Sequence, residues 1–329
     1  MEGLTMDQGY AGSSPQAPAS LPEIKMAYRG EGGDLFFVVL KNVFLTLITL
    51  GIYSAWGKTA RRAYMWKQVD IGGERLEYTG TGRELFFGYL KVGLGYLVLF
   101  GIPAMVMKIS KPVGTVLQLL GFLGLMIILP YAVYWSRRYL LSRTRWRGIR
   151  FGLAGSAGQF AKTWIWNWFL TIVTLGIYGP VFANKVYGAI INNTRYGDAS
   201  FSYDGRDRDA FKIGIKGILL SIVTLGIYSV WYRAEMLRFR VSHIRFDRAV
   251  GTIDITGGLI LRLTIMNLVC NALTLGLAFP WTATYTLKVV LERVRFLGAI
   301  DFARVGQRAV VGDAAGDGLA GALGVELGL

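Results

Sequence analysis

The sequence has one cysteine, Cys270, and one histidine, His243, in 329 residues. A disulfide scaffold needs several cysteines and a zinc site needs several Cys or His ligands, so both are excluded. Charged residues are scarce, at 17% of the chain against about 25% in an ordinary soluble domain. The sequence contains no recognisable Ser/His/Asp set and no paired carboxylates in its apolar segments, so we expect no enzyme and no metal or other cofactor.

Apolar residues are abundant instead. Hydrophobic residues make up 53% of the chain, the mean hydropathy is +0.41, and the formal net charge is +15. This combination predicts a multi-pass membrane protein with a basic aqueous face. We expect residues 1–25 to be a disordered tail without the apolar core of a signal peptide, 26–305 to be the membrane domain, and 306–329 to be loosely ordered.

A short motif recurs along the middle of the chain. Octapeptides at 46–53, 171–178, 221–228 and 271–278 share a Thr-Leu-Gly core, and the last three copies are spaced 50 residues apart. The 125-residue gap after the first copy leaves room for a diverged unit. The sequence therefore predicts about five repeated units, which span residues 34–68, 84–146, 158–195, 209–245 and 258–296.

Each unit is predicted to be an apolar helix, a break, and a second helix that is rich in Trp and Tyr and becomes basic. Glycine supplies a left-handed helix end, and proline is tolerated in the first turn of the next helix. The threonine hydroxyl can donate or accept at the helix end, where hydrocarbon offers no other partner. The predicted break residues are Gly51, Gly176, Gly226, Gly276, Pro180 and Pro280.

Polar stretches between the units, such as 69–78, 145–152 and 244–255, read as strand–turn–strand segments. The fold class predicted here is an all-α polytopic membrane protein with short β-hairpin-like segments between its helical units. Continuous spans, six in number, are the alternative. Hairpins are favoured because they place every basic stretch on one side, the cytoplasmic one, where similar stretches could pair into one small sheet. Some of the shorter hairpins would then enter the membrane only partway.

Several of these motifs together are similar to those of a known family. Phe36-Phe37, the 49–53 core, Trp56, Arg61-Arg62 and the 78–82 segment together resemble the YjgN-like family of multi-pass bacterial inner-membrane proteins, a domain of unknown function. The resemblance covers about residues 26–303. It implies an inner-membrane location, and it carries over no activity, ligand or catalytic residue.

A polar stripe is the first candidate site. Asparagines lie seven residues before the core threonine in three units, so Asn and Thr share a helix face. The stripe either holds helices together by hydrogen bonds, worth about 0.6–2 kcal/mol per contact, or lines a path for a solute. Its members are Asn42, Thr49, Asn167, Thr174, Thr224, Asn267 and Thr274.

Basic residues on the second helices are the other candidate. They either form an interfacial belt on anionic lipid headgroups or a basic vestibule that attracts an anionic solute or headgroup. Because these charges are spread along membrane-proximal helices, we expect no nucleic-acid partner. The candidates are Lys58, Arg61, Arg62, Arg137, Arg138, Arg233 and Arg238.

Two functions follow from these candidates. The first is a transporter or channel-like protein for a small or anionic solute, with the path at the repeat interface. The alternative is a non-catalytic membrane scaffold that binds anionic lipid or envelope partners. The expected partner is the bilayer, and a homo-oligomer stays open.

Overall fold

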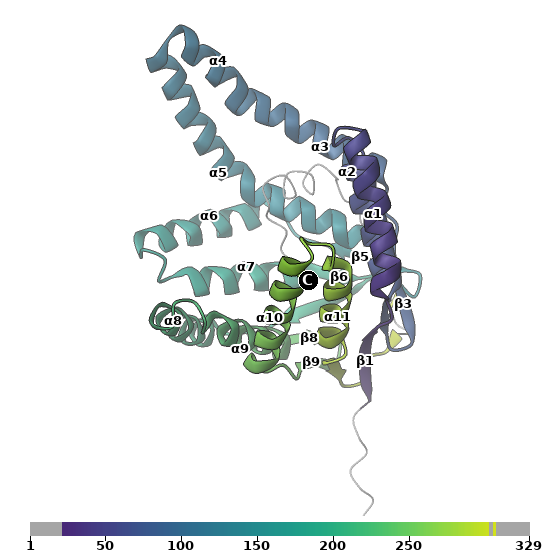
Figure 1. Cartoon of the computed structure of the whole chain (residues 1–329). Helices are drawn as coiled ribbons and strands as arrows, with labels where there is room; N and C mark the ends of the chain where they lie inside the picture. The colour runs from purple at the N-terminus through teal and green to yellow at the C-terminus, as the bar shows by residue number, and fades with distance from the viewer. Residues whose placement is uncertain (1–21, 303–304, 307–329) are drawn as a thin grey trace, which may run out of the picture.

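The computed structural model describes residues 22–302 and 305–306. Within these residues, ten short strands form a closed antiparallel barrel, and helical hairpins project from it (Figure 1). The strands are β1 (Glu23–Tyr28), β2 (Val69–Ile71), β3 (Glu74–Tyr78), β4 (Thr144–Trp146), β5 (Ile149–Leu153), β6 (Thr194–Tyr196), β7 (Ala199–Tyr203), β8 (Ile244–Phe246), β9 (Ala249–Ile253) and β10 (Val294–Leu297).

Each strand pairs with its neighbour in the sequence, and β1 pairs with β10 to close the ring. The predicted all-α fold class is therefore wrong. The sequence predicts several of these strands one by one, but each is only three to six residues long. They become a stable element only because units distant in the sequence contribute neighbouring strands to a ring without free edges.

Tight turns shape one end of the barrel. In the β4–β5 turn both central residues, Arg147 and Gly148, have positive φ angles of 50° and 76°, and Asp247 in the β8–β9 turn has φ 52°. Two-residue turns with positive φ match the twist of paired strands. Each such turn reverses the chain, so the helices leave from the opposite ends of the strands.

The helices are α1 (Gly32–Ile48), α2 (Ser54–Lys67), α3 (Gly82–Tyr96), the π-helix η1 (Leu97–Gly101), α4 (Ile102–Ile109), α5 (Lys111–Ser142), α6 (Ala157–Val173), α7 (Gly179–Asn193), α8 (Asp207–Val223), α9 (Ser229–Ser242), α10 (Gly257–Leu273) and α11 (Phe279–Leu291). They form five hairpins. Contacts run from each hairpin to the next and return from α11 to α1, so the hairpins form a closed ring, which we call the crown.

The hairpins differ in length. Only two stretches of the described chain are long and apolar enough to cross a bilayer, Gly82–Ile109 with 28 residues and Lys111–Ser142 with 32. They belong to one hairpin, which extends beyond the others in Figure 1. Of the six continuous spans of the alternative, only these two have a counterpart in the described residues, because the other hairpin helices have 13 to 17 residues.

Glycine–tryptophan contacts join neighbouring hairpins. A β-carbon at Gly32 would lie 2.8 Å from the Cα atom of Trp281, and one at Gly82 would lie 2.8 Å from the Cα atom of Trp56. Gly257 meets the ring of Trp231 in the same way. Only a residue without a side chain lets the start of one hairpin pack this closely on the indole of its neighbour.

The barrel core is aromatic. Trp146, Tyr196 and Phe246, from β4, β6 and β8, form one buried cluster. The segment after β10 completes it: Phe302 contacts the Trp146 ring edge-on at 5.1 Å between centroids, and the Arg147 guanidinium lies 4.9 Å from the Phe302 ring. This segment therefore belongs to the folded domain.

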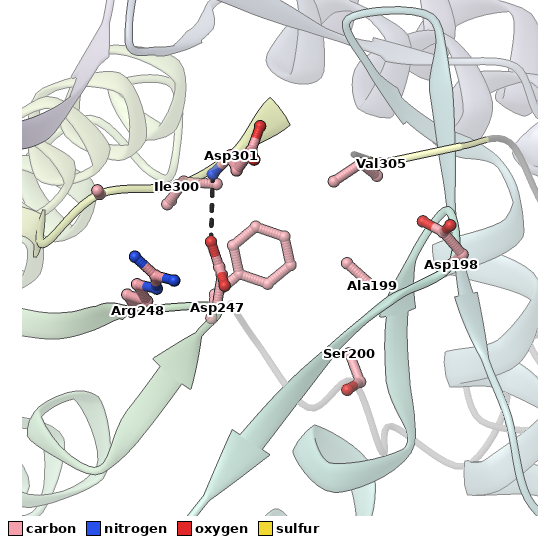
Figure 2. A pocket seen from close by; sticks show the side chains of 10 residues that line it. Asp198, Ala199, Ser200, Asp247, Arg248, Ile300, Asp301 and Val305 are labelled. Atoms are coloured by element: carbon pink, nitrogen blue, oxygen red, sulfur yellow. Dashed lines mark hydrogen bonds between the residues drawn. The ribbon is translucent and has the colours of Figure 1, made fainter. Parts of the chain in front are cut away.

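The same segment is held over the strand turns. The Asp301 N–H donates to Asp247 and the Gly306 N–H donates to Asp198, at 3.2 and 3.0 Å. Figure 2 shows the cavity of about 470 Å³ between this segment and the turns. Of the predicted tails, residues 23–25 lie in β1, whereas 1–21 and 307–329 lie outside the described residues.

Candidate functional site

The turns at the tips of the four short hairpins have the same conformation. At the first tip, Leu50 and Gly51 have φ angles of 49° and 93°, and Leu175, Leu225 and Leu275 repeat the value of Leu50 within 2°. The predicted break glycines Gly51, Gly176, Gly226 and Gly276 all lie in this turn, with φ between 87° and 93°. Pro180 and Pro280 lie in the first turns of α7 and α11.

Every backbone N–H of the turn has an acceptor inside the turn or the preceding helix. At the third hairpin the N–H groups of 174–177 and Gly179 donate to backbone carbonyls. The N–H of Tyr178 is the exception, and it donates to the Thr174 hydroxyl at 3.0 Å. Thr49, Thr224 and Thr274 accept in the same way, each at 2.9 Å. The core threonines therefore close their own turns.

The tips are also apolar and uncovered. Leu50, Leu175, Leu225 and Leu275 are 93–94% exposed, and the residue after each glycine is more than half exposed. A leucine in the left-handed region is unusual, since turns in water place Gly, Asn or Asp there. Four exposed leucines at this position indicate surroundings that are not water.

The asparagines of the polar stripe lie inside their own hairpins. Asn167 is buried, accepts from the Tyr178 hydroxyl at 3.1 Å and donates to the Thr163 carbonyl at 2.7 Å. Asn267 donates to Thr286 of α11 at 3.1 Å. Asn42 is buried against Gly57 of α2. The structure thus brings each Asn to the partner helix of its own unit, and Tyr178 links Asn167 to Thr174.

The predicted basic residues lie on three different second helices. Lys58, Arg61 and Arg62 are half-buried on α2, Arg137 and Arg138 are half-buried on α5, and Arg233 and Arg238 are exposed on α9. All seven lie in the part of the hairpin between its tip and the barrel. The structure does not gather them at one point.

A further set of cations was missed as a site. The central residue of β4, β6 and β8, and the second residue of β10, is an arginine: Arg145, Arg195, Arg245 and Arg295. Side chains alternate along a strand, and the residues after the first three belong to the aromatic core. These arginines therefore point away from the core, around the outside of the barrel. We call them the arginine girdle.

Two members of the girdle form ion pairs and two do not, although Glu77 of β3 lies opposite Arg145 in the sheet. Arg245 pairs with Asp204 at 2.7 Å, and Arg295 pairs with Glu23 at 3.0 Å. No carboxylate of the described chain lies within ion-pair distance of Arg145 or Arg195, and the Nε atoms of both are buried without a hydrogen-bond partner. An arginine that forms no ion pair is suited to bind an anion from outside the chain.

The sequence held a signal for the girdle, because its four members are spaced exactly one 50-residue repeat apart. In the sequence they look like the basic end of each second helix. The helices in fact end earlier, at Ser142, Asn193, Ser242 and Leu291. Because Asn193 is followed at once by β6, no Gly or Pro marks the change from helix to strand.

The chain is similar to other bacterial proteins. The chain matches the family described as "Bacterial protein of unknown function (DUF898)" over residues 23–216, 200–251 and 229–322. It belongs to this family. The matches together cover the barrel and all five hairpins. No solved structure matches the chain.

Curated relatives agree with the resemblance seen in the sequence. "Inner membrane protein YjgN" of Escherichia coli O157:H7 is 29% identical over 163 residues, which are 49% of this chain and 38% of the relative. Its namesake from Salmonella typhimurium is 26% identical over 177 residues, 50% of this chain and 43% of the relative. The matched region thus spans less than half of either relative. Their names support an inner-membrane location for the chain.

Proposed function

We propose that this protein is a non-catalytic scaffold of the inner membrane that binds anionic lipid headgroups through the arginine girdle and the basic second helices. The observation that carries the proposal is the position of the girdle. Four arginines surround the barrel next to a crown whose outer residues are apolar, which is where lipid headgroups meet hydrocarbon.

Charge supports this proposal. Arginine recognises phosphate with paired N–H donors, so Arg145 and Arg195, which form no ion pair within the described chain, are suited to hold phosphate oxygens. Near a membrane surface each cation is worth about 1 kcal/mol of attraction to anionic lipid. The net charge of +15 makes that attraction a property of the whole aqueous face.

The solute-path hypothesis receives less support. Its stripe residues are used within single hairpins, where Asn167 bonds Tyr178 and Thr174 closes the tip. These two groups satisfy each other and have little left for a passing solute, whereas the Oδ1 of Asn267 is buried without a hydrogen-bond partner. Transport stays a prediction, and liposome flux with the wild type and with Asn167→Ala plus Thr174→Val tests it.

Lipid retention tests the scaffold. The protein is reconstituted in nanodiscs with equal amounts of phosphatidylglycerol and phosphatidylcholine, released, and analysed by native mass spectrometry for the lipid that stays bound. We expect phosphatidylglycerol to be enriched, and the enrichment to be lost in Arg145→Glu plus Arg195→Glu. The matched control is Arg145→Lys plus Arg195→Lys, which keeps the charge and should retain most of the enrichment.

Charge reversal of Arg61 and Arg62 on α2 tests the helical part of the same surface, and we expect a smaller loss. Equal retention of both lipids by the wild type would refute the proposal. So would an unchanged enrichment in the Arg145→Glu plus Arg195→Glu protein, provided that its circular dichroism spectrum matches that of the wild type.

A further inference from the structure

We infer that the four short hairpins are re-entrant: their tips end among the acyl chains near the middle of the bilayer, while the long hairpin alone crosses to the other side. This inference rests on the proposed placement of the barrel at the headgroups. The acyl chains are then a second partner of the protein, in contact with the apolar hairpin tips and not with the arginine girdle.

Charge spacing fixes the depth. On the first helix of each short hairpin, the last charged residue is exposed and lies nine or thirteen residues before the tip leucine, which corresponds to about 14–20 Å of helix. On the second helix, the first charge follows the tip leucine after eight to thirteen residues, or about 12–20 Å. The charged residues before the tips are Lys41, Lys162, Lys216 and Arg262, and those after are Lys58, Lys185, Arg233 and Lys288.

These lengths are too short for a crossing. The hydrocarbon core is about 30 Å thick, so an uncharged arm of 12–20 Å reaches roughly its middle. The ion pair between Lys216 and Glu235 of the partner helix, at 3.2 Å, places two charges at the same height of one hairpin and so limits how deeply that hairpin can enter the hydrocarbon. Isolated charges deeper in the bilayer are costly.

The tip chemistry suits this depth. Hydrocarbon offers no hydrogen-bond partners, so a turn can end there only if its own atoms satisfy its N–H groups. All six N–H groups from Thr174 to Gly179 are satisfied, and the same six bonds recur at the other three short tips. The exposed leucine then contacts acyl chains rather than water, so its exposure carries no hydrophobic cost.

The long hairpin has a different tip. Its arms are free of charge from Lys91 to Lys108 and from Lys111 to Arg137, which corresponds to about 26 and 39 Å of helix. Its turn carries the exposed Lys108 and Lys111 instead of a Thr-Leu-Gly core. Lysines at the end of a full-length hairpin match the headgroups of the opposite leaflet.

Cysteine labelling tests the inference. In a Cys270→Ala background, single cysteines replace Leu175 at a short tip, Ile109 at the long tip and Glu74 beside a barrel turn. All three side chains are solvent-accessible in the structure, and the first two are 93% and 89% exposed, so the substitutions disturb little packing. A membrane-impermeant maleimide is added to sealed vesicles of each orientation.

We expect Glu74→Cys to react from one side, Ile109→Cys only from the other side, and Leu175→Cys from neither until detergent is added. A spin label at Leu175→Cys should be relaxed strongly by oxygen and weakly by a water-soluble nickel complex. Reaction of Leu175→Cys on the side of Ile109→Cys would mean a full crossing, and on the side of Glu74→Cys a surface position; either result overturns the inference. The labelling does not depend on which lipid is bound, so it fails independently of the scaffold proposal.

Discussion

Replacing Thr174 by valine removes one acceptor and almost no volume. The Thr174 hydroxyl accepts from the Tyr178 N–H at 3.0 Å and donates to the Leu170 carbonyl at 2.8 Å. The carbonyl keeps a partner after the substitution, because the Thr174 N–H also donates to it at 3.0 Å. The net effect is therefore one backbone N–H without an acceptor at an apolar hairpin tip.

The cost can be bounded. An amide left without a hydrogen bond in a protein interior costs about 1–3 kcal/mol, whereas polar contacts between membrane helices average about 0.6 kcal/mol and reach about 1.7. We expect Thr174→Val to lower the free energy of unfolding by about 1–2 kcal/mol. The four tips belong to separate hairpins, so the quadruple variant at Thr49, Thr174, Thr224 and Thr274 should lose about four times as much.

Equilibrium unfolding in mixed micelles with increasing dodecyl sulfate measures this loss. Thr174→Ser is the matched control, because it keeps the hydroxyl and removes only a methyl group. The reasoning is refuted if the valine variant unfolds at the same detergent fraction as the wild type, or if the serine variant loses as much stability as the valine variant.

Three further predictions follow from single contacts. Gly226→Ala should lower the free energy of unfolding by about 1–2 kcal/mol because φ is 90° there, whereas Gly33→Ala, in open space within helix α1, should raise it by up to about 1 kcal/mol. The same unfolding assay compares the two variants, and equal effects would contradict the turn geometry. Phe302→Ala should lower the melting temperature of the barrel, with a loss of about 1–3 kcal/mol for a partly buried ring; an unchanged melting temperature would mean that the segment does not seal the core. Burial raises the pKa of Tyr196 to about 12 from an ordinary 10, so the stability that depends on its proton is complete below pH 10 and lost between pH 10 and 12. The difference in melting temperature between wild type and Tyr196→Phe should change over that pH range, and a constant difference would show that ionisation of Tyr196 does not affect stability.

The hairpin tips could be read from the sequence because their chemistry is local. Every bond of the turn joins residues at most five positions apart, for example Gly176 N–H to the Thr171 carbonyl. Glycine at a left-handed position and threonine as an acceptor are properties of the octapeptide itself. The depth of the tips was also encoded, in the distance from each tip to the nearest lysine or arginine.

The barrel could not be read in this way. Only every second strand pair is local, as between β4 and β5. The other pairs join different units, as in Phe201 of β7 opposite Phe246 of β8, so no short window of the sequence contains both partners. Three-residue strands are too short to show alternation, and β1 begins at Glu23, inside the segment predicted to be a tail. The girdle was missed for the same reason, since an arginine is recognised as part of a ring only when the ring is known.

The closing strand of the barrel shows how a repeated chain avoids pairing in the wrong order. In β2, the first unit carries Asp70 at the strand position where three later units carry Arg145, Arg195 and Arg245. Asp70 forms an ion pair at 2.7 Å with Arg29, which lies just after β1. On the other side of β1, Glu23 pairs with Arg295 of β10. The Asp70 carboxylate is buried, and an arginine at position 70 would place two cations together at this seam. The exchange of one charge therefore favours β1 between β2 and β10 over insertion between any two later units, and it lets strands 272 residues apart close the ring in one register.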